Sequence, residues 1–124
     1  MTYAPEITIV WHPETTPIEG NALAAGDDEI DRQEYERIRN ELESGNLWAW
    51  CCVEVQAEFR GLTGRAFLGC CSYDGEEDFR SNSDYFADLV AEATDDLRSQ
   101  LADLQGCEIG EAASEHAVIR YSAD

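Results

Sequence analysis

The strongest constraint on the fold is residues 47–59, LWAWCCVEVQAEF, in which apolar residues occupy every second position. Because successive side chains of a strand point to opposite sides of a sheet, this pattern predicts a β-strand with one apolar face. A shift of one residue would carry Glu54 and Glu58 into the core, so we expect a firm register. The apolar positions are Leu47, Ala49, Cys51, Val53, Val55, Ala57 and Phe59.

A second strand is predicted to return beside this one. Residues 61–64, Gly-Leu-Thr-Gly, give a turn signal, and the strand-like run 65–73 follows. With Arg60 opposite Arg65, Val55 would face Cys70 and Cys52 would face Tyr73. The other face would then carry an aromatic set that either the chain itself or a second copy must cover. This possible self-association set is Trp48, Trp50, Phe67 and Tyr73.

The remaining elements complete an α+β fold. Residues 6–12 read as an N-terminal strand that Pro13 ends, and helices are expected at about 28–44 and 83–105. We therefore predict a single α+β domain over residues 1–124: a small antiparallel sheet, built from the N-terminal strand and a central hairpin (about 47–59 and 65–73), with both helices packed on its apolar face. Residues 115–122 either add an edge strand or fray.

The charge is extreme: 27 Asp and Glu residues face eight arginines and no lysine, giving a net charge of −19. Such a surface repels nucleic acid and anionic membranes, so it disfavours direct binding to either and favours a basic protein or a divalent cation. A halophile's hydration surface is the alternative interpretation. The candidate partner-binding carboxylates are Asp27, Asp28, Asp31, Glu34, Glu41, Asp74, Glu76, Glu77, Asp78, Asp88, Glu92, Asp95 and Asp96.

The sequence contains only weak candidates for catalytic or metal-binding motifs. The vicinal pairs Cys51-Cys52 and Cys70-Cys71 lie on strands, where neighbours point to opposite faces, so neither pair can chelate a metal from one side. His12 precedes Pro13, and a structural role for it is favoured over a catalytic one. We predict no catalytic residue, no metal and no cofactor. A small-molecule or metal site around His12, the 13–26 loop and the cysteines stays open as an alternative.

Targeting signals are equally weak. No apolar run approaches the length that spans a bilayer, and residues 1–14 lack the basic and apolar segments of a signal peptide. We expect a cytoplasmic protein whose thiols stay reduced.

Two stretches carry a resemblance. WHPETTPIEGNALAAGDD at 11–28 and LGCCSYDGEEDFR at 68–80, followed by DYFADL, resemble small acidic proteins of tailed bacteriophages, over most of residues 7–104. The resemblance carries over no catalytic residues, and it implies a phage context, with the host-cell cytoplasm as location. Small acidic phage proteins are similar as a class to inhibitors of host defence, including anti-CRISPR proteins.

The expected function is therefore non-enzymatic. The chain would bind and inhibit a basic, nucleic-acid-binding host protein, such as a CRISPR effector, through acidic surfaces that take the place of DNA phosphates. The alternatives are a phage accessory or structural protein that self-associates through the aromatic sheet face, and the small-molecule or metal-binding protein. Both a monomer and a homodimer fit the sequence.

Overall fold

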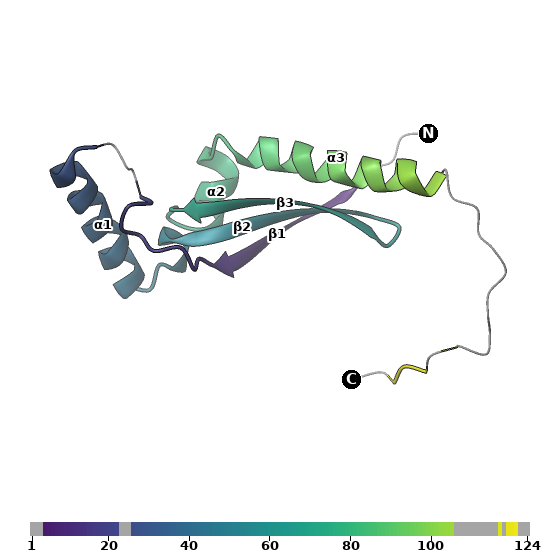
Figure 1. Cartoon of the computed structure of the whole chain (residues 1–124), viewed down its shortest axis with the longest axis horizontal. Helices are drawn as coiled ribbons and strands as arrows, with labels where there is room; N and C mark the ends of the chain where they lie inside the picture. Colours follow the sequence, from purple (N-terminus) through teal and green to yellow (C-terminus); the bar gives the residue numbers. More distant parts are fainter. Residues whose placement is uncertain (1–3, 23–25, 106–116, 118, 122–124) are drawn as a thin grey trace.

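A computed structural model describes residues 4–22, 26–105, 117 and 119–121. The elements form a three-stranded antiparallel sheet of order β1-β2-β3 with helices around it, which confirms the α+β class. Helix α3 lies along one face of the sheet, and α1 lies beyond one end of it (Figure 1). In chain order the elements are β1 (Glu6–Pro13), α1 (Asp28–Glu43), the 3-10 turn η1 (Leu47–Ala49), β2 (Cys51–Phe59), β3 (Leu62–Cys71), α2 (Glu76–Asn82) and α3 (Phe86–Gln105).

The main core lies between the sheet and α3. The alternating apolar residues of β2 are fully buried from Cys51 to Ala57 and partly buried at Phe59, and they pack against the buried stripe Leu89, Ala93 and Leu97 of α3. At Gly64 the helix approaches the backbone of β3 so closely that a Cβ atom there would lie 2.0 Å from the carbonyl oxygen of Ala93. The absence of a side chain at Gly64 therefore fixes how closely α3 approaches the sheet.

The hairpin differs from the prediction. Phe59 lies opposite Leu62, so the turn consists of Arg60 and Gly61 alone, both with positive φ (50° and 82°). Val55 accordingly lies opposite Ala66 instead of Cys70, and the predicted register is wrong by four residues. An even shift leaves every side chain on its predicted face, so the alternation could not distinguish the two registers.

The end of β3 departs from the alternation. The ladder is irregular between Cys51 and Val53, and Cys70 has a φ of 54°. This irregularity turns Cys71 into the core and leaves Cys70 exposed, which is the reverse of the predicted arrangement.

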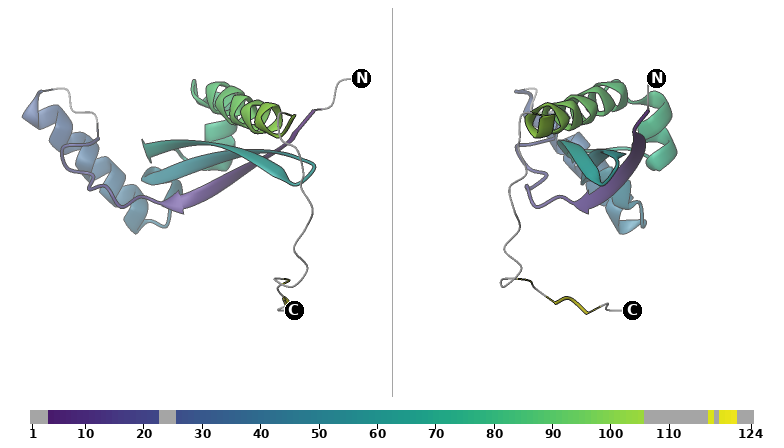
Figure 2. Two further views of the ribbon diagram at one scale, coloured as in Figure 1. Left: turned by 45° about the vertical axis from the view of Figure 1, so that its right-hand side comes forward. Right: turned by 90° about the vertical axis from the view of Figure 1, so that its right-hand side faces the viewer.

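Helix α1 packs in a small core of its own. Its buried Ile38 meets Ala22, Ala49 and Trp50, with Ile18 and Leu42 at the edge. The expectation that both helices cover the apolar sheet face is therefore wrong for α1. The first residues of the predicted central strand form η1 instead, and this turn holds α1 beyond the end of the sheet (Figure 2).

Helix α2 lies between the predicted hairpin and the second predicted helix, where no helix was expected, and the predicted helix 83–105 begins only at Phe86. Helix α2 is anchored by Phe79, which is fully buried among the rings of Trp48, Tyr73 and Phe86 at centroid distances of 6.2, 5.1 and 5.5 Å. Half of the predicted edge strand at 115–122 lies outside the described residues, and the described residues 117 and 119–121 form no strand.

Candidate functional site

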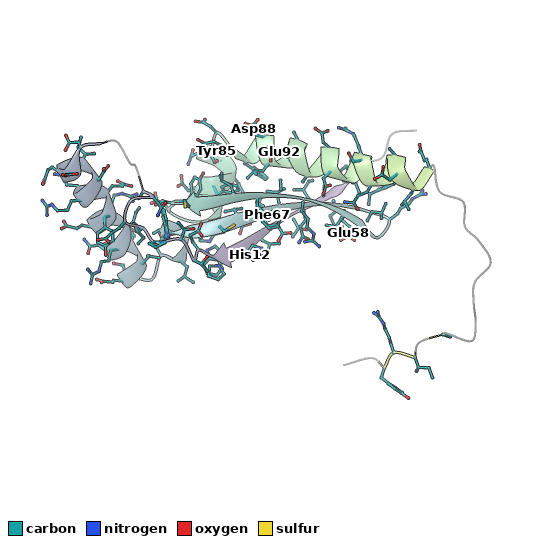
Figure 3. The ribbon with its side chains drawn as sticks, in the orientation of Figure 1. His12, Glu58, Phe67, Tyr85, Asp88 and Glu92 are labelled. Carbon is teal, nitrogen blue, oxygen red and sulfur yellow. The ribbon has the colours of Figure 1, made fainter. Side chains whose placement is uncertain are left out.

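The sheet face opposite α3 carries polar side chains. The register places Val10, Glu54 and Phe67 in one row across the three strands, with His12 and Cys52 in the next row. Phe67 is 58% exposed, and its ring lies 6.3 Å from the ring of His12. Figure 3 shows these two side chains on neighbouring parts of the sheet. We call this surface the open face.

A buried carboxylate lies at the centre of the open face. Glu54 is only 3% exposed, and its Oε1 lies 2.7 Å from the Nε2 of His12. Its Oε2 accepts hydrogen bonds from Gln56 Nε2, at 2.9 Å, and from Arg65. Burial alone raises the pKa of Glu54, but these three hydrogen bonds outweigh it and hold the pKa below the ordinary value. The site therefore keeps an ionised carboxylate inside the fold.

Cys52 is the potential nucleophile nearest to this network, since it lies opposite His12 in the ladder. Burial raises the pKa of its thiol, and the charges of Glu14 and Glu54 raise it further. A reactive cysteine needs the reverse, an electropositive surrounding that lowers its pKa. The arrangement thus leaves Cys52 protonated at neutral pH.

The corrected register changes the position of the other cysteines. Cys51 lies directly opposite Cys71, and both are buried free thiols. Burial raises the pKa of Cys51 to about 11 and that of Cys71 to about 12. Within the described ranges, no group of three or more His, Cys, Asp or Glu side chains is placed to hold a metal ion.

The predicted aromatic set does not form one surface. Trp48 and Tyr73 pack around Phe79 at the main core, and Trp50 is 7% exposed against α1, where its Nε1 donates to the carbonyl of Thr16. Only Phe67 lies on the open face. Two features separate these side chains: the turn η1, which replaces the first residues of the predicted strand, and the irregularity at Cys70. The alternating pattern of apolar residues predicts neither feature.

Several candidate carboxylates are tied to the fold. Asp27 caps α1 by accepting from the backbone N–H groups of Glu29 and Ile30. Asp78 accepts from the backbone N–H of Asp74 in front of α2, and Asp96 accepts from that of Arg65, which joins α3 to β3. These three side chains therefore stabilise the fold as well as adding negative charge to the surface.

Four of the seven carboxylates of α1 pair with the three arginines of the same helix. Arg32 lies between Glu29 and Glu36 at 2.6 and 3.0 Å, and Arg37 pairs with Glu34. The first helix therefore presents a mixed surface, with Asp28 and Asp31 at its N-terminal end and Glu41 hydrogen-bonded to Asn46.

The outer side of α3 is different. Arg98 is the one cation of this helix and pairs with Asp95 at 2.9 Å. Asp88 and Glu92 have no ion-pair or hydrogen-bond partner among the described residues, and Tyr85, 54% exposed, precedes them at a spacing that places all three on one side. We call Tyr85, Asp88 and Glu92 the α3 strip (Figure 3). The two carboxylates were predicted from the sequence, whereas Tyr85 was not, although its position outside the apolar stripe of the helix indicated that it would be exposed.

On α2, the remaining candidates are also engaged. Glu76 lies 4.0 Å from Arg80, and Glu77 accepts from the hydroxyl of Ser81.

A cleft of about 220 Å³ lies between the 18–22 loop and α1, and a second of about 230 Å³ lies beside β1.

Comparisons with protein-family models, curated proteins and solved structures find no match to this chain. None of the helices in the described ranges combines the length and the apolar character needed to cross a membrane.

Proposed function

We propose that this chain is a non-enzymatic protein that binds and inhibits a basic, nucleic-acid-binding host protein, with the α3 strip as its main contact. The observation that carries the proposal is that two neighbouring carboxylates on the outer side of α3 lack a partner among the described residues. Asp88 and Glu92 stand unpaired among the described residues, whereas Glu29, Glu34, Glu36 and Glu43 of α1 all pair with arginines of their own helix. A surface with uncompensated carboxylates is attracted to arginine- and lysine-rich sites.

The α3 strip also offers a contact that a purely acidic helix lacks. The ring of Tyr85 provides an aromatic face next to two carboxylates, and arginine side chains bind both groups. A nucleic-acid-binding groove supplies arginines spaced to meet phosphates, so the carboxylates would take the place of phosphates there. The resemblance to small acidic phage proteins supports a host-defence protein, such as a CRISPR effector, as the target in the host cytoplasm.

The test is capture of host proteins on the immobilised chain, with elution by a salt gradient. The double variant Asp88→Asn/Glu92→Gln should lose the captured partner. The matched control Glu29→Gln/Glu36→Gln removes the same charge from α1, where both carboxylates bind Arg32, and should retain it. DNA added to the column should displace the partner.

Two results would contradict the proposal. Equal loss in both double variants would show that net charge alone matters. A complex that survives about half-molar salt, where exposed charges are screened beyond a few ångströms, would not be held by carboxylates.

Self-association through the open face is a second candidate, favoured by the exposure of Phe67 beside His12. Light scattering of the wild type and of Phe67→Glu over a range of concentrations tests it. A dimer that the substitution dissociates would support this function, and a wild type that is monomeric at every concentration would rule it out.

A further inference from the structure

A second surface, independent of the α3 strip, lies along β1. A cleft of about 230 Å³ is lined by Ile7 and Ile9 of β1, Phe86 and Val90 of α3, and Glu76 and Arg80 of α2. Helix α3 packs on β2 and β3, so it leaves the apolar side of β1 only partly covered. We call this cleft the β1 groove.

The groove runs beside an unpaired strand edge. In the order β1-β2-β3, the only neighbour of β1 among the described strands is β2, so its outer backbone groups face away from the sheet. An occupant that fits both features is an extended segment with apolar side chains at every second residue, because these would enter the groove while its backbone pairs with β1.

We propose that this occupant is the C-terminal part of the chain itself, residues 119–121. Ile119 and Tyr121 are 77% and 89% exposed in the structure, the two most exposed of the large apolar side chains described. They stand two residues apart, so in an extended conformation both point to the same side. Docking would bury both side chains against Ile7, Ile9, Phe86 and Val90.

The chain is long enough to reach the groove. Val90 lines the groove and Gln105 ends α3, so at ~1.5 Å per residue the end of the helix lies ~22 Å further along its axis. Thirteen residues separate Gln105 from Ile119, and an extended chain of that length spans up to ~43 Å.

The direction of α3 fits as well. Figure 1 shows α3 running back along the sheet from the end where β3 finishes. A segment that then turned onto β1 would run parallel to β1 and β3. Parallel strands need a crossover connection, usually a helix, and α3 would be that crossover.

Charge on the other side of the sheet supports this occupant. With Ile119 and Tyr121 in the groove, Arg120 points toward the open face. There Glu6 lies opposite Glu58, both exposed and neither with an ion-pair partner among the described residues. Like charges directly opposite each other destabilise a sheet, and a cation at the neighbouring position relieves the repulsion.

Amide hydrogen exchange of the full chain, followed by NMR, tests the proposal. We expect the amides of β1 to be protected in the wild type, and to exchange about tenfold faster or more in Ile119→Glu/Tyr121→Glu. The control Leu104→Glu, at an exposed apolar position near the end of α3, should leave β1 unchanged. Arg120→Glu should also speed exchange, and Glu58→Arg in that background should restore protection.

The proposal also requires contacts between the Ile119 methyl groups and those of Ile9 or Val90, seen as nuclear Overhauser effects. Equal β1 exchange rates in the wild type and the double variant would overturn it. Protection that appears only at high protein concentration would overturn it too, because the occupant would then be a second copy.

Discussion

At the scale of single residues, Glu54 is the side chain whose charge matters most to the sheet. Its carboxylate is buried and accepts hydrogen bonds from His12, Gln56 and Arg65. We expect Glu54→Gln to lower the free energy of unfolding at pH 7 by about 1–3 kcal/mol, since an amide satisfies fewer of these donors and leaves Arg65 without its counter-charge. Urea denaturation of both proteins measures the difference.

The effect of Glu54→Gln on the free energy of unfolding should depend on pH. The pKa of Glu54 is lower in the folded protein than in the unfolded chain, so its ionised form stabilises the fold above the unfolded value of about 4.3. This stabilisation is lost as the pH falls through the folded value. The difference in stability between the wild type and Glu54→Gln should therefore be constant near neutrality and shrink below about pH 4. A difference that grows on acidification would show that Glu54 is not held ionised.

Gly64 tests how closely α3 approaches β3. A Cβ atom at this position would meet backbone atoms of Ala93 and Leu97 at 2.0 and 2.6 Å, and neither can move without shifting the helix. We expect Gly64→Ala to cost about 1–3 kcal/mol or more in unfolding free energy, as overpacked cores do. Gly75→Ala is the control, because its backbone is extended and nothing lies within 4 Å of its Cβ position. Equal stability of the two variants would contradict the packing described.

At the scale of elements, α1 should unfold separately from the sheet. Its buried Ile38 belongs to a small core with Ala22, Ala49 and Trp50, whereas Leu97 of α3 belongs to the main core. We expect Ile38→Ala to speed hydrogen exchange throughout α1 while β2 stays protected. Leu97→Ala should instead lower global stability by about 2–5 kcal/mol and expose β2 as well. Loss of β2 protection in Ile38→Ala would show that the two cores unfold together.

The same elements show what the sequence could specify. Alternation identified the faces of β2 correctly because Val53, Val55 and Ala57 contact the core directly. The alternation did not predict the hairpin register, because the turn requires a positive φ at Arg60 and arginine rarely adopts one. The hydrogen bond from Arg65 to Glu54 depends on that register, so the network around Glu54 could not be predicted from the sequence. The position of α1 was predicted wrongly because a narrow apolar stripe shows that a helix packs against another surface but does not identify that surface.

At the scale of the whole molecule, a net charge of −19 on 124 residues should make stability depend on salt. Repulsion among carboxylates opposes the compact state, and its range shrinks from ~30 Å at 0.01 M to ~8 Å at 0.15 M ionic strength. We therefore expect the urea midpoint to rise over this interval.

The urea midpoint, measured over a wider range of NaCl concentrations, also distinguishes a binding surface from a halophile's hydration surface. Once the screening length is shorter than the spacing of unpaired carboxylates such as Asp88 and Glu92, further NaCl should add little, so the curve should level off by about 0.5 M. A halophilic protein would instead remain unfolded at about 0.15 M and gain stability into the molar range. In that case the carboxylates of α3 would serve hydration, and their lack of partners would no longer indicate a basic ligand.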